Sequence, residues 1–414
     1  MTNFQKNIVI ATLMGASVVL SRLPFLESAP FHTDSLHFLR GVTKTGVAHP
    51  PGYIGYCITG RLFSYVIGNA HVGLLAFNLT ATFFTAFFLY FLGLKMYGAT
   101  PKSSALMCLL FLASPFSYYY GVVSLSYIEE CTCAVLLVLL CVNHIKRKGS
   151  WWLPSAVLAL GASLRQTVLV FLFPLWAFTM LHDYLPKPFI SSIEEKSTYR
   201  RSLKPFFVGL LIIIVLVTLW MIPTFILYEQ QGGYAGQMNQ QMRDAVWANS
   251  VFVAGFNGLL KNSSKTFFYL FWSLNVALLI YFIKPTRNYF KDLWHKERKI
   301  LFLLLVWILP ALVFYSLIFM GPPGYLLCVL PAFYLPFAGV LHDKVVRCGL
   351  LAAIFSASLF LVPRPLPEHD RNNRMMNIII MRYNATGIKE KNSRNLQHID
   401  SKKPRDYGEV NEWY

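Results

Sequence analysis

Long apolar stretches separated by short polar connections make up most of the chain. The apolar runs lie at 7–23, 72–94, 103–120, 127–145, 151–164, 166–182, 205–228, 266–284, 300–320, 324–341 and 348–363. A helix needs about 20 apolar residues to cross a bilayer core. The pattern therefore predicts an all-α polytopic bundle of about 11 transmembrane helices. The runs 151–164, 166–182 and 348–363 are short for this role.

The first apolar run and the segment after it set up the start of the bundle. Lys6 precedes the run 7–23, and no A-x-A cleavage pattern follows it, so we expect an uncleaved first helix rather than a signal peptide. Residues 53–68 are less apolar and contain three glycines and an arginine. We interpret them as an interfacial helix that follows the first external loop, 24–52.

Composition and charge agree with a membrane protein and indicate its orientation. The chain is 55% hydrophobic, its mean hydropathy is +0.48 and its net charge is +18. Lysine and arginine gather in alternate connections, at 95–102, 146–150, 183–204, 284–299 and 342–347, whereas 121–126 and 321–323 contain none. By the positive-inside rule the N-terminus is cytoplasmic and 24–52, 118–128 and 229–265 lie outside. The basic balance thus needs no nucleic-acid partner.

Two units are predicted: a transmembrane domain at 1–363 and a polar tail at 364–414. The same orientation places the tail outside. It is itself basic, so an inside tail with one span miscounted stays open. The seven cysteines lie inside or beside apolar segments without zinc-site or redox-motif spacing, which favours buried, structural side chains.

The first external loop carries two candidate groups. Asp34 stands before an apolar run, where it is either a helix-starting acid or a carboxylate held at the membrane surface as a general base or metal ligand. His49-Pro50-Pro51-Gly52-Tyr53 is a stiff turn before a helix. Free N–H groups at a helix start bind anions, so His49 is a candidate phosphate contact, and a purely structural turn is the alternative.

Charged residues also occur inside or beside later apolar runs. Glu129 and Glu130 open the run 127–145; they are interfacial caps or, since neighbours on a helix point differently, one of them faces a site. Arg165 lies between two short apolar halves and needs an anionic partner or a wet cavity. A phosphate fits its guanidinium fork.

Two further segments are less specific. Arg243 lies in a long outer loop with several Met, Gln and Trp residues, predicted to be an interfacial amphipathic helix or a lid. Tyr325 follows Gly321-Pro322-Pro323-Gly324, a helix-opening turn or the wall of a substrate groove. Asn262-Ser-Ser and Asn384-Ala-Thr match glycosylation sequons.

Taken together, these residues resemble the GT-C superfamily of membrane glycosyltransferases that use polyprenyl-phosphate-linked sugars. The stretch from Asp34 to Gly46-Val-Ala-His-Pro-Pro-Gly-Tyr53 is most similar to the branch related to protein O-mannosyltransferases. Looser similarities involve Asn78, Glu129, Arg165 and the segment Gly324–Ala332. Asp34 lacks the adjacent second acid of several relatives, which leaves the base and any metal dependence open.

The resemblance implies a GT-C bundle in a bacterial inner membrane or endoplasmic reticulum membrane, with its site facing periplasm or lumen. A hexosyl or mannosyl group would pass from a polyprenyl-phosphate donor to a protein, lipid or glycan hydroxyl, with inversion. Asp34 and Glu129 are the expected catalytic residues and, if a divalent cation is used, its oxygen ligands. The expected donor or substrate contacts are His49, Tyr53, Glu130, Arg165, Arg243 and Tyr325.

Three other functions remain open at this point. A transporter or flippase of lipid-linked glycans would need charges deep in the bundle, and such proteins often have an internal repeat. The sequence contains no visible internal repeat. A polymerase or ligase of whole lipid-linked glycans is compatible with Arg243 in the outer loop. A scaffold that has lost activity is the non-catalytic alternative.

Overall fold

In the computed structural model, the described part of the chain is residues 2–341 apart from 28–29, 31, 147–148, 185–202, 231 and 297, together with 348, 349, 351 and 355. All regular elements in this part are helices. Five are long and apolar enough to cross a membrane: α1 (Asn3–Arg22, extended to Phe25 by a 3₁₀ turn), α4 (Ala70–Tyr97), α7 (Tyr127–Ile145), α10 (Lys204–Glu229) and α14 (Arg298–Leu317). Shorter apolar helices are α3 (Ile54–Ile67), α5 (Pro101–Leu112), α8 (Trp152–Leu164) and α9 (Thr167–Met180).

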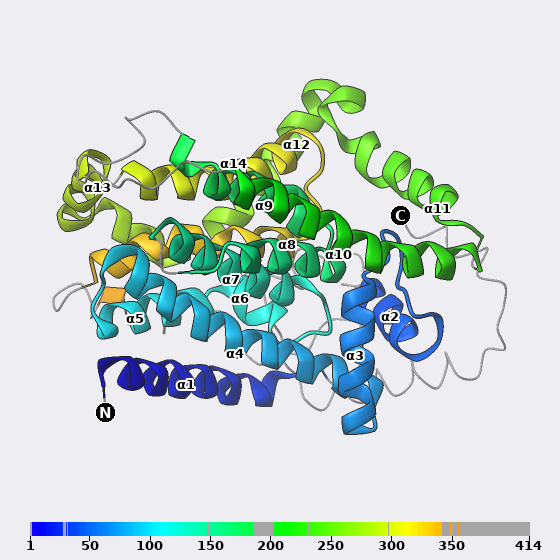
Figure 1. Ribbon diagram of the computed structural model, residues 1–414, viewed down its shortest axis with the longest axis horizontal. Coiled ribbons are helices and arrows are strands. Elements are labelled where there is room, and N and C mark those ends of the chain that lie inside the picture. Colours follow the sequence, from blue (N-terminus) through cyan, green and yellow to red (C-terminus); the bar gives the residue numbers. More distant parts are fainter. Residues whose placement is uncertain are drawn as a thin grey trace.

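The long helices lie side by side, and α3 crosses them at one end of the bundle (Figure 1). Helix α4 packs against α1, α3, α5 and α7, while α8 packs against α7, α9 and α10. In the most apolar stretch of each helix, 61% of the residues of α7 are buried, against 11% of those of α10. Helix α7 is therefore at the centre of the bundle, and α10 presents its apolar side chains outward, as a lipid-facing helix does.

Smaller elements complete the described chain. At the α3 end are α2 (Thr33–Arg40), a π-helical turn η2 (Gly41–Thr45) and α6 (Pro115–Tyr120). After α10 come α11 (Tyr234–Gln241), the π-helical turn η5 (Met242–Val246), the 3₁₀ turn η6 (Trp247–Asn249), α12 (Val251–Leu274), η7 (Asn275–Phe282) and α13 (Lys284–Lys296). The last are η8 (Pro323–Cys328), α15 (Leu330–Tyr334) and η9 (Leu335–Gly339). Helices α2 and α3 confirm the prediction of helices in and after the first loop.

Several predicted spans are broken helices. The run 103–120 is divided between α5 and α6, and 324–341 is three short pieces. Proline has no amide hydrogen and clashes with the preceding turn, so Pro115, Pro331 and Pro336 each begin a new piece instead of continuing an old one. Most of 348–363 and all of 364–414 lie outside the described residues, so the count of about 11 spans stays a prediction.

Three of the basic connections that were expected on one side, 95–102, 146–150 and 284–299, lie at one end of the bundle in the described part of the chain. Lys95 donates to Asn143 Oδ1 at 2.8 Å, and Lys146 donates to the Lys95 carbonyl. The Tyr97 and Tyr289 rings lie 6.2 Å apart, which places α13 at the same end. Figure 1 shows α13 and the N-terminus at the left, with α2, α3 and α11 at the right. The candidate residues of the first loop are therefore at the end opposite to these basic connections.

Candidate functional site

Arg165 lies where the chain leaves one helix and starts the next. Helix α8 ends at Leu164 and α9 begins at Thr167, so Arg165 is extended, with φ −159° and ψ 120°. Its backbone N–H still donates to the Gly161 carbonyl at 3.0 Å. The side chain is nevertheless 4% exposed. The predicted interruption between two apolar halves is thus present, and it directs a guanidinium into the bundle.

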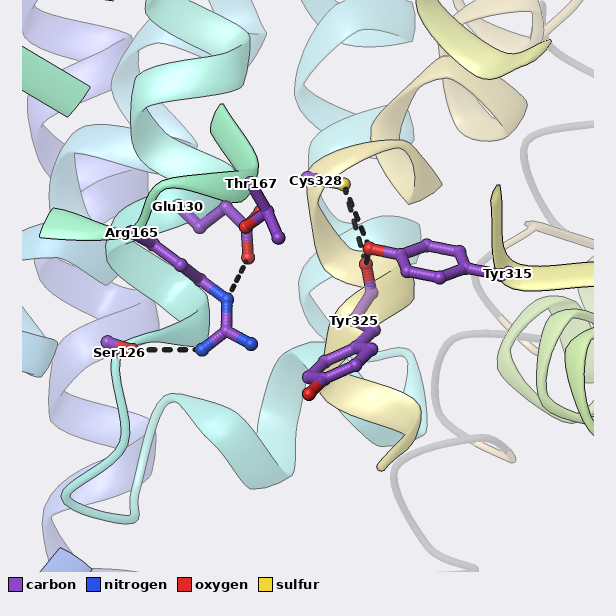
Figure 2. Close-up of polar contacts among 7 residues, drawn as sticks. All are labelled: Ser126, Glu130, Arg165, Thr167, Tyr315, Tyr325 and Cys328. Carbon is purple, nitrogen blue, oxygen red and sulfur yellow. Dashed lines mark hydrogen bonds and ion pairs between the residues drawn. The ribbon is translucent and has the colours of Figure 1, made fainter. Parts of the chain in front are cut away.

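The guanidinium is held by polar groups from two other segments (Figure 2). Arg165 Nε lies 2.9 Å from Glu130 Oε2 on α7, and Nη1 donates to Ser126 Oγ at 3.2 Å. The Thr167 hydroxyl donates to the other oxygen of Glu130. Glu130 Oε1 thus accepts a hydrogen bond, while Oε2 is ion-paired with Arg165 Nε at a distance of 2.9 Å without the geometry of a hydrogen bond.

Aromatic rings complete the surroundings of Arg165. Its Cζ lies 4.3 Å from the ring centre of Tyr127, 4.9 Å from that of Tyr325 and 5.5 Å from that of Tyr53. Each desolvated cation–π contact contributes up to about 2 kcal/mol. We call Tyr53, Ser126, Tyr127, Glu130, Arg165 and Tyr325 the Arg165 cluster. Tyr325 lies on the side of the guanidinium away from Glu130 (Figure 2).

The position of Tyr325 depends on the glycine before it. A Cβ on Gly324 would lie 2.6 Å from Cγ of Tyr127 and 2.8 Å from Cζ of Tyr120. Real Cβ atoms essentially never come that close, so only glycine fits here without movement of the rings. The Tyr315 hydroxyl also donates to the Tyr325 carbonyl at 2.8 Å. The segment expected as a turn or a groove wall therefore forms one wall of the Arg165 cluster.

Ser126 is placed by a clamp on the loop before α7. The Glu27 carboxylate accepts hydrogen bonds from the backbone N–H and the hydroxyl of Ser124, each at 2.8 Å. Asn78, fully buried on α4, donates to the Leu125 carbonyl at 3.0 Å. Buried polar groups satisfied in this way rigidify their surroundings. The clamp thus connects the first loop and α4 to the Ser126 hydroxyl that binds Arg165.

The His49–Tyr53 turn is closed by its own backbone. Ala48 N–H donates to the Gly52 carbonyl and Gly52 N–H to the His49 carbonyl, both at 3.0 Å. Gly52 has φ 118°, a conformation that glycine adopts readily. Helix α3 begins at Ile54, so the two prolines lie in the turn before the helix, as the sequence predicts.

The His49 ring is packed in aromatic surroundings. It lies 5.3 Å from the His37 ring and 5.7 Å from the Phe38 ring, and its Nδ1 has no hydrogen-bond partner among the described residues. Burial lowers the pKa of His49 to about 4, while Asp34 opposes this effect and His37 and Arg165 add to it. The ring is therefore neutral near pH 7. It can contact a phosphate as a neutral group but not as a cation.

Asp34 lies in the first turn of α2 and is partly exposed. Its carboxylate acts electrostatically on His49, Tyr53 and Tyr325. One turn later on the same helix, the His37 ring lies 5.3 Å from the His49 ring, so Asp34 lies on the helix that packs against the His49 turn. Of the residues that the sequence singled out, Asp34, His49, Tyr53, Glu130, Arg165 and Tyr325 come together here.

Glu129 lies apart from the Arg165 cluster. The sequence had left open which of the two adjacent acids faces a site. Glu130 pairs with Arg165, and Glu129 points elsewhere because successive residues on a helix point about 100° apart. Glu129 is 1% exposed, and neither carboxylate oxygen has a hydrogen-bond partner in the described part of the chain. Within the same residues no three His, Cys, Asp or Glu side chains are grouped to hold a metal ion.

Arg243 was expected among the donor contacts and lies elsewhere in the structure. It is in η5, its side chain is 81% exposed, and its Nε bonds Asp244 at 3.1 Å. Among the described contacts, none joins it to the Arg165 cluster.

Four residues of the site were not found from the sequence: Glu27, Ser126, Tyr127 and Thr167. Three of them lie within four residues of a residue that was singled out, which was the only available signal. Glu27 acts on a loop 97 positions away, so nothing local indicates its role.

Comparisons with known proteins support the fold. No protein-family model matches the chain, and no curated protein matches it. Two solved structures do, both of ArnT from Cupriavidus metallidurans. The structure bound to undecaprenyl phosphate has a TM-score of 0.55 at 11% identity and covers 84% of this chain and 69% of that chain. The apo structure has a TM-score of 0.59 at 11% identity, with coverages of 90% and 68%. The chain therefore has the polytopic GT-C fold that its motifs resemble.

Proposed function

We propose that the protein is a membrane glycosyltransferase that moves a sugar from a polyprenyl-phosphate donor to an acceptor hydroxyl, on the extracytoplasmic side. The observation that carries this proposal is the buried Arg165 guanidinium, framed by three tyrosine rings. The partly exposed Asp34 lies on α2, which packs against the His49 turn through His37. The ArnT structure bound to undecaprenyl phosphate supports the class of donor.

The donor phosphate approaches Arg165 from the side of Tyr325. Glu130 and Ser126 already occupy Nε and Nη1, and the other terminal nitrogen points toward Tyr325 (Figure 2). When the bond between sugar and phosphate breaks, the phosphate gains negative charge. A guanidinium held in place by Glu130 stabilises that charge without reorganising, which is the largest electrostatic contribution expected in such a site.

Asp34 acts as the general base. It takes the proton of the acceptor hydroxyl as the oxygen attacks the anomeric carbon, and polyprenyl phosphate leaves from the opposite face with inversion. One carboxylate suffices because the phosphate leaves without an acid, unlike the aglycone in inverting hydrolases, which use a pair of carboxyl groups. The transferred group in this proposal is a hexosyl or mannosyl group.

The test measures release of free polyprenyl phosphate from a panel of polyprenyl-phosphate sugars by purified protein. We expect one donor to be consumed and Asp34→Asn to lose at least ~100-fold, the lower end of a general base's contribution. Asp292→Asn, an exposed acid on α13 at the other end of the bundle, is the matched control and should keep full activity.

Two results would overturn parts of the proposal. If a donor is consumed and Asp34→Asn is as fast as the wild type, the base is a different residue. If no donor is consumed with acceptors present, while reconstituted vesicles show flux of the lipid-linked sugar, the protein is a transporter.

A further inference from the structure

The chain from Tyr234 to Ser250, which we call the arch, stands away from the long helices. It consists of α11, η5 and η6, and it connects the end of α10 to α12 at the same end of the bundle as α2 and α3 (Figure 1). Neither the sequence motifs nor the Arg165 cluster explains its function.

A cavity of about 500 Å³ opens in the arch. Its lining residues are Gly236, Asn239, Gln240, Met242, Arg243 and Trp247. Small-molecule sites occupy roughly 300–1,000 Å³ and combine apolar or aromatic walls with a few polar groups. The cavity has a volume in this range and a mixed lining, and it is a solvent-open hollow whose lining residues all belong to the arch.

The lining chemistry fits a neutral carbohydrate. Asn239 and Gln240 carry amides that both donate and accept hydrogen bonds, as sugar hydroxyls do. Trp247 is 42% exposed and offers a flat ring on which the C–H face of a sugar can pack. Arg243 adds donors, but Asp244 balances its charge at 3.1 Å. A strongly anionic ligand would find no net positive charge here.

One end of the arch is fixed to the turn that carries His49. The Tyr234 ring lies 5.2 Å from the Tyr228 ring and 4.7 Å from the Phe225 ring. The Tyr228 hydroxyl donates to the Ala48 carbonyl at 2.5 Å, directly before His49. Helix α11 is thereby connected to the first external loop.

The other end is fixed to the segment before Tyr325. Asn262 Nδ2 donates to the Asn249 carbonyl at 2.8 Å and to the Ile318 carbonyl at 3.2 Å. Its Oδ1 accepts from Met320 N–H at 3.2 Å. With 1% exposure, Asn262 is a structural brace rather than a glycosylated asparagine, despite its sequon. The arch therefore runs between the first external loop, reached at Ala48, and the segment before η8, reached at Ile318 and Met320.

We propose that the arch cavity binds a neutral saccharide portion of the acceptor and so presents its hydroxyl to Asp34. This inference rests on the proposed function and narrows its acceptor, which was left as protein, lipid or glycan, to a molecule that carries a glycan. Trp247 packs on the sugar ring, and Asn239 and Gln240 bind its hydroxyls.

The test compares variants in the cavity with a control outside it. Trp247→Ala and Gln240→Ala are assayed with mannotriose and chitotriose as probes, beside serine-containing peptides. Phe256→Ala is the control, because Phe256 is 73% exposed on α12 and does not line the cavity. We expect the cavity variants to raise the acceptor KM or the saccharide Kd at least ~10-fold. Release of polyprenyl phosphate by hydrolysis without acceptor, and the thermal unfolding midpoint, should stay at the wild-type level.

The outcomes separate this inference from the proposed function. Saccharide binding is measured by titration calorimetry without any donor, so it does not depend on glycosyl transfer. If the wild type hydrolyses a donor but cavity variants and Phe256→Ala have equal acceptor KM, or if only peptides accept the sugar, the arch inference is refuted and the glycosyltransferase stands. If saccharides bind but no donor is consumed, the proposed function fails instead.

Discussion

Replacement of Glu130 by glutamine tests how the site holds its buried charge. The Arg165 and Glu130 side chains are 5% and 0% exposed, and their charged atoms lie 2.9 Å apart. Removal of one partner of such a buried pair typically costs about 3–5 kcal/mol, because the other charge stays buried without compensation. The amide of Glu130→Gln can still accept from Thr167, and three tyrosine rings still face Arg165. We therefore expect a loss near the lower end, about 3 kcal/mol.

Glu129→Gln is the matched control for this change. Glu129 is the adjacent acid on the same helix, equally buried, and its carboxylate has no hydrogen-bond partner in the described residues. The isosteric substitution breaks no ion pair there. We expect it to change the unfolding free energy by less than about 1 kcal/mol.

A double-mutant cycle decides whether the cost is electrostatic. Arg165→Met combined with Glu130→Gln removes both charges, and replacing a buried pair by uncharged side chains is often close to neutral. The double variant should be more stable than the sum of the single losses predicts, by up to about 3 kcal/mol. Unfolding by SDS in mixed micelles, followed by tryptophan fluorescence, measures all four proteins. Strictly additive losses would refute the view that Glu130 is present to compensate Arg165.

Two further predictions concern residues around this pair. Gly324→Ala pushes a Cβ into Tyr127 and Tyr120, so we expect about 1–3 kcal/mol of destabilisation and weaker donor binding, measured by the same unfolding assay and by donor KM; unchanged values would show that the rings move freely. Burial lowers the pKa of His49 to about 4, against about 6.5 when unfolded, so as pH falls the unfolded chain binds a proton first. The free energy of unfolding is therefore highest above about pH 6.5 and falls toward pH 4. In His49→Asn the unfolding free energy should depend less on pH across that window; the same pH dependence in the variant and the wild type would contradict this.

Much of the fold could be predicted from the lengths of the apolar runs. Much of the site could be predicted from charged residues that lie inside or beside those runs. Arg165 was identified because a lone arginine between apolar halves needs a partner, and the structure provides Glu130. The hydrophobic periodicity of α7 could not show whether Glu129 or Glu130 faces Arg165, because tertiary packing decides which side of α7 lies against the segment that carries Arg165. The position of the loop carrying Arg243 likewise depends on contacts between residues far apart in the sequence, such as that of Tyr228 with the Ala48 carbonyl.

Backbone breaks were harder to predict than helices. The run 324–341 is apolar enough for a span, but it contains two internal prolines and is held as short pieces. The pieces place Tyr325 against Arg165, at a distance of 4.9 Å from ring centre to guanidinium. Counting apolar residues estimates how favourably side chains transfer from water into the membrane. It takes no account of the backbone N–H groups that prolines lack, so it predicts one continuous helix where the structure has short pieces.

The bond from Tyr228 to the Ala48 carbonyl also has a consequence for biosynthesis. The two residues are 180 positions apart, so the His49 turn leaves the ribosome long before its partner exists. At about 5–20 residues per second this interval lasts roughly 10–40 s. Gln166, which donates to the Pro51 carbonyl at 3.1 Å, arrives 115 positions after it. During elongation the carbonyls of the turn therefore stay without these partners, and the contacts of the turn are completed only after α10 has been inserted.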